Sequence, residues 1–193
     1  MQYILAFDPG GTTGWCLAHI PNDAPLRWEN VTIIEQNEVP EGHFRMIGDI
    51  IGTLTSAPDA DYLRAIVVEE FRLYHHGEAN APKKYNQVGS TFPSAQIIGT
   101  IRYVVQVIEH AQSISIPIFM QGAHLIHDRK KGVNEKYKTL TPEEIQCLPK
   151  SPHVRDAYSH LKVFLRRIER AQQGIPTCKG GDTLHRLANI GKI

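Results

Sequence analysis

The sequence predicts an α/β protein, and three features of the 193-residue chain indicate this fold class. Short apolar runs bounded by glycine or proline recur along the chain and are typical of buried strands. Three longer segments carry apolar residues at three- and four-residue spacing, which is the pattern of amphipathic helices. The two patterns alternate after the third strand, so helices are expected to cross over a sheet.

Two apolar runs separated by a glycine-rich break open the chain. The first, residues 3–8, ends on Asp8, and the second follows three glycines within residues 9–14. Two such runs predict strands joined by a tight turn. A carboxylate at the end of a buried strand has a large desolvation cost unless it is paired or holds a cation. Three uses stay open for this stretch: a plain turn, a nest of backbone N–H groups for a phosphate, or a metal site with Asp8 as a ligand.

A third strand and a crossover helix follow, and then a second buried strand that ends on acidic residues. Residues 28–39 contain a β-branched run, which predicts a third strand and an antiparallel meander. Residues 41–55 have helical spacing and predict a helix. Residues 65–68 are apolar on both faces, as in a central parallel strand, and lead into Glu69 and Glu70. Because open α/β sheets bind ligands at the carboxyl ends of their strands, two carboxylates at one edge indicate a cation site.

The middle of the chain combines a long loop with one more helix and strand. Residues 73–92 show no periodicity and predict the loop, in which Lys83 and Lys84 are interleaved with aromatic residues. This mixture suits the backbone and unstacked bases of a nucleic acid, and a surface loop without function is the alternative. Residues 93–112 predict a helix, and residues 114–120 predict a fifth strand.

The last helix is predicted over residues 151–173, after a basic segment and a short helix that starts at residues 141–144 with Thr-Pro-Glu-Glu. Three- and four-residue steps share one face of a helix. Beside the apolar stripe, a second stripe therefore collects His153, Asp156, His160 and Arg167. His153 and Asp156 are side by side in the first turn. On this helix alone, an aspartate that stabilises the helix dipole beside a surface histidine is the alternative to a site.

The net charge of +1 hides an asymmetry between the two parts of the chain. Residues 1–120 hold 7 Lys and Arg against 13 Asp and Glu, whereas residues 121–193 hold 14 against 7. A basic block attracts polyanions such as nucleic acids. A solvated helical face of mixed charge is the alternative explanation.

The overall composition is that of one globular domain, with 41% hydrophobic and 21% charged residues. No apolar stretch approaches the roughly 18 residues of a membrane span, and the N-terminus lacks the basic region of a signal peptide. We therefore expect a cytoplasmic protein without a membrane partner. The three cysteines are far apart and odd in number, so reduced thiols are expected at Cys16, Cys147 and Cys178.

Four motifs together resemble, in order and spacing, the RuvC-type Holliday junction resolvases of the ribonuclease H-like superfamily. They are ILAFDPG at residues 4–10 with TTG at 12–14, IVVEEF at 66–71, QIIG at 96–99 and HVRDA at 153–157. The doubled glycine at residues 10 and 11 resembles the phage-borne branch of that family.

The resemblance implies a ribonuclease H-like fold. Its five-stranded mixed sheet would have an antiparallel meander of strands 1–3, strands 4 and 5 parallel to strand 1, and flanking helices. Residues 1–173 would form the nuclease domain, and residues 174–193 a C-terminal tail. The implied metal ligands are Asp8, Glu69 and Asp156. They would hold two Mg²⁺ ions, with Mn²⁺ as a substitute, because hard cations prefer oxygen ligands. His153 would bind weakly, contact the phosphate or move a proton.

The resemblance also implies an activity and partners. The enzyme would be a homodimeric Mg²⁺-dependent endodeoxyribonuclease that cuts four-way or other branched DNA in recombination, repair or phage DNA processing, in the cytoplasm of a bacterium or of a phage's bacterial host. The family keeps junction-probing aromatic residues after the second acidic motif, where this chain has a longer loop. The expected DNA-contacting residues are Phe71, Arg72, Tyr74, Lys83, Lys84, Lys130, Lys131 and Lys136.

Two other functions are compatible with parts of the sequence. The loop at residues 8–14 also resembles the phosphate loop of sugar kinases and actin-like ATPases, but those proteins close two such domains over a nucleotide, and 193 residues supply one. A DNA-binding relative without catalysis is the second alternative. Three carboxylates in register argue against it, because an inactive site has no reason to keep buried charges.

Overall fold

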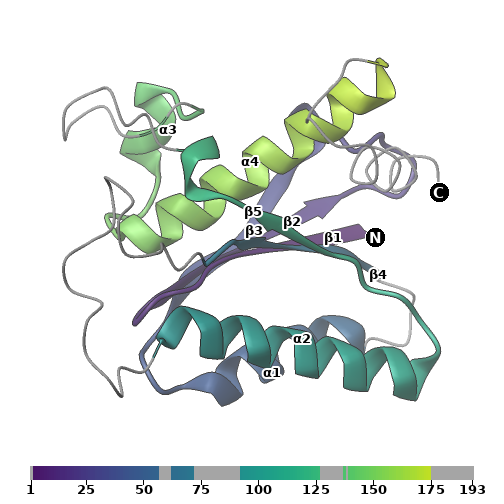
Figure 1. Cartoon of the computed structure of the whole chain (residues 1–193). Coiled ribbons are helices and arrows are strands. Elements are labelled where there is room, and N and C mark those ends of the chain that lie inside the picture. The colour runs from purple at the N-terminus through teal and green to yellow at the C-terminus, as the bar shows by residue number, and fades with distance from the viewer. Residues whose placement is uncertain (1, 57–61, 72–91, 127–136, 138, 175–193) are drawn as a thin grey trace, which may run out of the picture.

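The computed structural model describes residues 2–56, 62–71, 92–126, 137 and 139–174. A five-stranded sheet runs through its middle and has helices on both faces (Figure 1). The sheet order is β3-β2-β1-β4-β5. The strands are β1 (Gln2–Asp8), β2 (Thr13–Ile20), β3 (Thr32–Val39), β4 (Tyr62–Glu69) and β5 (Ile118–Gln121).

The strand directions confirm the predicted fold class. β2 is antiparallel to β1 and to β3, whereas β4 is parallel to β1 and β5 is parallel to β4. This is the mixed five-stranded sheet that the family resemblance implies. The register also brings three strand ends to one edge, because Phe7 pairs with Val68 and Glu69 pairs with Gln121.

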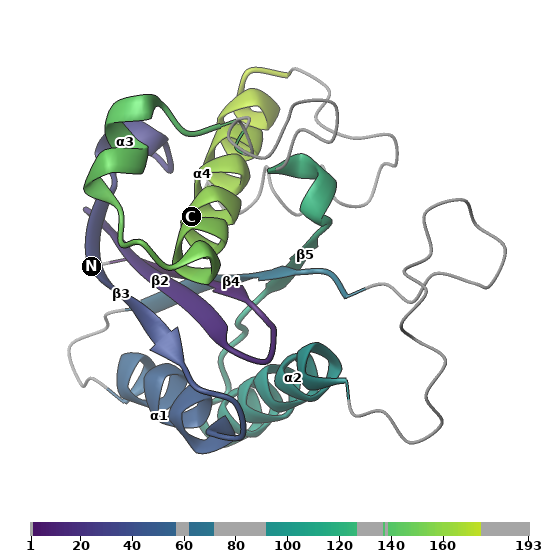
Figure 2. The same ribbon diagram turned by 90° about the vertical axis from the view of Figure 1, so that its left-hand side faces the viewer.

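Helices cover both faces of the sheet, which explains why the central strands are apolar throughout. Helices α1 (Phe44–Thr55) and α2 (Pro93–Gln112) lie on one face, and α4 (Pro152–Gln172) lies on the other beside the short α3 (Pro142–Cys147) (Figures 1 and 2). Successive residues of β1 alternate between the two cores: Leu5 and Phe7 pack toward α1 and α2, and Ile4 and Ala6 toward α4.

The helix starts follow the predicted capping residues. Thr141 and Glu144 form a reciprocal capping box at the start of α3. The Ser151 hydroxyl accepts a hydrogen bond from the Val154 N–H at 3.2 Å and caps α4. Helix α2 has the predicted bounds and ends at Ser113, which adopts a left-handed conformation with φ of 55°.

β4 starts three residues before its predicted start, and three other boundaries also differ from the prediction. Trp28 begins a 3₁₀ helix, η1 (Trp28–Asn30), and not a strand, because its ring packs edge-on against Tyr158 at 5.2 Å between centroids. Helix α1 starts three residues late, since Gly42 has a φ of +80°. β5 starts at Ile118 because Pro117 has no N–H and the Ile116 N–H donates to the Glu109 carboxylate at 2.6 Å.

A buried lysine of α4 contacts both α3 and η1. Lys162 of α4 is 2% exposed, and its ammonium group contacts the Glu144 carboxylate of α3. The same nitrogen lies 5.2 Å from the centroid of the Trp28 ring, which adds a cation–π contact. One side chain therefore connects α3, α4 and η1.

Several predictions concern residues outside the described ranges. They include the loop over residues 73–91, the tail over residues 175–193 and Cys178. The division between a nuclease domain and a tail stays a prediction. Cys16 is buried and Cys147 is exposed, and both are free thiols. Within the described part of the chain, no helix combines the length and apolar character that a membrane span requires.

Candidate metal centre

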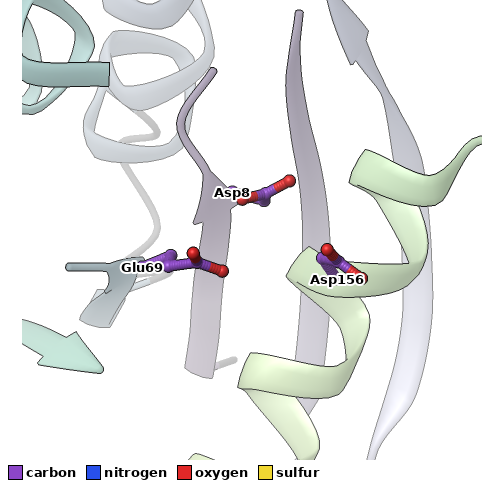
Figure 3. A group of neighbouring side chains, drawn as sticks. All are labelled: Asp8, Glu69 and Asp156. Carbon is purple, nitrogen blue, oxygen red and sulfur yellow. The ribbon is translucent and has the colours of Figure 1, made fainter. Parts of the chain in front are cut away.

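Three carboxylates from three elements meet at one edge of the sheet. Asp8 ends β1, Glu69 ends β4 and Asp156 lies in the first turns of α4. Each offers a ligand oxygen, and these oxygens all lie within 4.8 Å of one another. Figure 3 shows the three side chains pointing toward a common space between the strands and the helix. The sequence predicted this set from strand ends and from the family resemblance.

The sheet brings the first two carboxylates together. β1 and β4 are adjacent parallel strands, so their carboxyl ends reach the same edge with Asp8 and Glu69 side by side. Glu70 points to the other side of the strand, and its N–H donates to the Gln121 carbonyl at 2.7 Å. Among the described residues, Glu69 and not Glu70 belongs to the cluster.

A close backbone contact brings the third carboxylate to the sheet. Gly14 of β2 faces the first turn of α4, and a Cβ at this position would lie 2.1 Å from the His153 carbonyl carbon and oxygen. Only glycine permits this approach. The Ser151 hydroxyl also donates to the Glu38 carboxylate at the end of β3. These two contacts fix the start of α4, and with it Asp156.

The environment makes Asp8 hard to ionise in the absence of a cation. Burial, followed by the nearby Glu69 and Asp156 carboxylates, raises the pKa of Asp8 from 3.8 to about 7, although the hydrogen bond and the charge of His153 act in the opposite direction. A divalent cation would remove this penalty, because an opposite charge favours the ionised form. Three carboxylates also match the oxygen ligands that Mg²⁺ prefers. The donor set therefore fits a hard divalent metal.

His153 lies against Asp8. Its Nδ1 is 2.9 Å from Asp8 Oδ2, and its side chain is 38% exposed, against 10% for Asp8. When Asp8 is ionised, its carboxylate can only accept hydrogen bonds, so Nδ1 then carries the proton of the neutral ring and Nε2 is left as an acceptor. The carboxylate cluster contains no His153 nitrogen among its described ligand atoms, and the role of His153 in metal binding stays a prediction.

No protein-family model matches the chain, and no curated protein matches it in sequence. RuvC of T. thermophilus in complex with a Holliday junction substrate has a TM-score of 0.49 and 16% identity, over 90% of this chain and 97% of that one. A second Thermus thermophilus RuvC structure has a TM-score of 0.45 and 16% identity, over 89% and 96% of the two chains.

The yeast mitochondrial Holliday junction resolvase Ydc2 is a third similar structure, with a TM-score of 0.41 and 12% identity, over 84% of this chain and 77% of that one. All three TM-scores lie below 0.5. Identities of 12–16% do not assign an activity to this chain.

Two partners of the three carboxylates were not predicted from the sequence. His160 is fully buried, and its Nε2 lies 2.8 Å from Glu69 Oε2. The sequence placed His160 on the stripe of Asp156, four residues further along, which was a signal without an assigned role. Tyr137 donates a hydrogen bond to Asp156, and burial, followed by this contact, raises the pKa of the phenol above its usual range. No periodicity marks Tyr137.

Most of the residues predicted to contact DNA lie outside the described ranges. Phe71 is the exception, and its ring packs against Phe92 with centroids 5.7 Å apart. This aromatic pair joins the end of β4 to the start of α2, close to Glu69. Predictions outside the described residues concern Arg72, Tyr74, Lys83, Lys84, Lys130, Lys131 and Lys136.

Proposed function

We propose that this protein is a divalent-metal-dependent endodeoxyribonuclease that hydrolyses phosphodiesters in branched DNA, with four-way junctions as the preferred substrate. One observation carries the proposal: Asp8, Glu69 and Asp156 converge from two strands and a helix, with ligand oxygens within 4.8 Å. Such carboxylates repel one another, and a cation relieves the repulsion. The substrate class rests on the motif resemblance to the RuvC-type resolvases.

The three carboxylates would hold one or two Mg²⁺ ions, with Mn²⁺ as a substitute. When bound, the metal supplies a water of lowered pKa and neutralises charge on the phosphate and the leaving 3′ oxygen. The protein contributes preorganisation. Asp8 and Glu69 are on hydrogen-bonded neighbouring strands, and Asp156 is on a helix whose first turn contacts β2 and β3, so little rearrangement is needed in the reaction.

His153 would move a proton or contact the phosphate. Its Nδ1–H is fixed by Asp8, so its Nε2 accepts a proton, and the partial exposure of the ring lets Nε2 reach a water or a substrate. This aspartate–histidine contact also sets the orientation of the ring.

We also propose how the protein contacts DNA, how it assembles and where it acts. The basic residues of the C-terminal third would contact phosphates, and Phe71 would face the branch point. The protein would act as a homodimer, since two symmetric cuts are needed to resolve a four-way junction. Residues 1–173 would form the nuclease domain, residues 174–193 a tail. The enzyme would serve recombination, repair or phage DNA processing in the bacterial cytoplasm.

A cleavage assay tests the function. Purified protein with Mg²⁺ or Mn²⁺ is incubated with labelled four-way junction, flap, single-stranded and linear duplex DNA. We expect cleavage of the junction in preference to the linear duplex, and loss of cleavage with EDTA. Asp8→Asn, Glu69→Gln and Asp156→Asn should each be inactive but still bind DNA, because removing negative charge lowers repulsion toward phosphates.

Glu70→Gln is the matched control, since it removes a carboxylate from the adjacent position of the same strand. It should keep wild-type activity. An inactive Glu70→Gln with an active Glu69→Gln would show that the ligand of this strand has been assigned one residue too early. Binding of a nucleotide analogue without any DNA cleavage would favour the kinase-like alternative.

A further inference from the structure

Glu69 is held by a chain of two buried side chains that crosses the sheet edge. His160 of α4 is fully buried, and Gln121 at the end of β5 is 2% exposed. His160 Nε2 lies 2.8 Å from Glu69 Oε2, and its Nδ1 lies 3.0 Å from Gln121 Oε1. Glu69, His160 and Gln121 therefore link β4, α4 and β5.

The hydrogen bonds of this chain give His160 a defined orientation. The Glu69 carboxylate is an acceptor, so Nε2 of His160 carries a proton and donates it to Oε2. Gln121 Oε1 accepts a hydrogen bond from a protonated Nδ1, and the same amide turned by 180° would present its N–H to an unprotonated Nδ1. A buried polar chain in which every member is satisfied holds its side chains rigidly.

Rigidity matters for glutamate more than for the two aspartates, because its longer side chain has one more rotatable bond. An unrestrained Glu69 carboxylate would adopt several rotamers, and only some of them face Asp8 and Asp156. The bond from His160 occupies one of about four lone-pair positions on the carboxylate and leaves the others for a cation.

We propose that His160 and Gln121 position Glu69 for metal binding, an inference that rests on the proposed function. His160 is a positioning residue and not a metal ligand, because its two ring nitrogens are already occupied by Glu69 and Gln121. It also differs from His153, whose ring is 38% exposed. A fully buried ring cannot reach a substrate, so His160 acts through Glu69 alone.

Mn²⁺ binding to the 193-residue chain without DNA tests the inference, with free Mn²⁺ measured by electron paramagnetic resonance. His160→Leu removes both nitrogens, and we expect it to weaken Mn²⁺ affinity by about 10- to 100-fold, the usual effect of losing a partner of a metal ligand. His160→Gln keeps an N–H for Glu69 and should restore most of the affinity. Gln121→Met removes the hydrogen-bond partner of His160 Nδ1 and should weaken Mn²⁺ affinity to a smaller extent.

Ser159→Ala is the matched control. Ser159 is the neighbour of His160 on α4 and is also fully buried, but its hydroxyl donates to the Arg155 carbonyl within the helix at 2.7 Å. This variant should bind Mn²⁺ as the wild type does. Thermal unfolding of every variant identifies those that do not fold. If His160→Leu is among them, His160→Gln and Gln121→Met still provide the comparison.

A measurement on the metal-free protein tests the contact separately. With ¹⁵N-labelled histidine, NMR should detect a proton on Nε2 of His160 whose signal moves in Glu69→Gln and is unchanged in Ser159→Ala. A folded His160→Leu or Gln121→Met that binds Mn²⁺ as tightly as Ser159→Ala would overturn the positioning role and leave the proposed function intact. Equal losses in His160→Leu and His160→Gln would also contradict it, since packing alone would explain them. A wild-type protein that binds no Mn²⁺ would refute the proposed function, and the positioning role with it, even if the NMR contact is present.

Discussion

Asp8 is the metal-site carboxylate whose pKa is raised by its surroundings. Its pKa of about 7 reflects burial first and the neighbouring carboxylates second. The metal-free protein therefore loses stability when Asp8 ionises. We predict that Asp8→Asn raises the free energy of unfolding at pH 8 in EDTA by on the order of 1–3 kcal/mol, while it abolishes cleavage. Urea unfolding with a tryptophan signal measures this change.

Asp49→Asn on the surface of α1 is the control for that prediction. Asp49 faces Arg45 at 3.8 Å, and both side chains are largely exposed, so the substitution should change stability by less than about 1 kcal/mol. A destabilised Asp8→Asn would mean that Asp8 is needed for folding itself.

The same shift predicts a pH dependence. The pKa of Asp8 is about 7 in the folded protein and 3.8 as the reference for the unfolded chain. Between these values the folded state binds more protons, so the stability of the metal-free protein falls as the pH rises from about 4 to about 7 and then levels off. Unfolding at pH 5, 6, 7 and 8 in EDTA measures the slope. Asp8→Asn should show less of this fall, and an identical slope in both proteins would refute the assignment.

His153 can be tested separately from the carboxylates. We predict that His153→Ala lowers the cleavage rate by about 100-fold, as for a general acid or base, and so less than the carboxylate variants do. His153→Asp should restore much of the rate in Mg²⁺, because it supplies an oxygen ligand. Junction cleavage in Mg²⁺ and in Mn²⁺ from pH 6 to 9 measures both. Wild-type behaviour of His153→Ala under every condition would leave the chemistry to the three carboxylates.

At the scale of elements, the approach of α4 to β2 decides whether the site is complete. A Cβ on Gly14 would lie 2.1 Å from the backbone of His153, and backbone atoms cannot move aside as a flexible side chain would. We predict that Gly14→Ala lowers the free energy of unfolding by about 3 kcal/mol, at the upper end of overpacking effects, and weakens metal binding. Urea unfolding and Mn²⁺ titration measure the two effects.

Gly52→Ala in α1 is the matched control, since apart from its chain neighbours and the backbone of its own helix no atom lies within 4 Å of the added Cβ. Alanine favours helix more than glycine does, so this variant should be stabilised by about 0.5–1 kcal/mol. Equal stability of the two variants would show that α4 can shift without loss.

The elements that were predicted well are those whose pattern is set by their own residues. Apolar runs or stripes mark the buried faces of β1, α2 and α4. The residues that begin and end these elements lie next to them in the sequence. The start of β5 was wrong because a distant carboxylate, Glu109, takes the N–H of Ile116. Contacts between residues that are distant in the sequence could not be predicted in the site either. Asp8 and Glu69 follow apolar runs and could be predicted, whereas the contact of His160 with Gln121 spans 39 residues and leaves no periodic signal.

The whole molecule carries one cluster of three carboxylates among its described residues, yet resolving a four-way junction takes two symmetric cuts. We predict that the protein is a homodimer with two sites facing the same way, an isologous arrangement. Light scattering at micromolar concentration measures the mass. A strict monomer that still cuts both strands of a junction at symmetric positions would contradict this prediction.

Helix α4 supplies Asp156, His153 and His160, and it follows all five strands in the chain. During translation the ribosome therefore releases Asp8 and Glu69 long before the residues that complete the site with them. Because the chain emerges from its N-terminus, a nascent polypeptide has a partly formed sheet but lacks Asp156. Under the proposed function, an unfinished copy cannot cut DNA, and nuclease activity begins only after the last helix has been synthesised and has docked on the sheet.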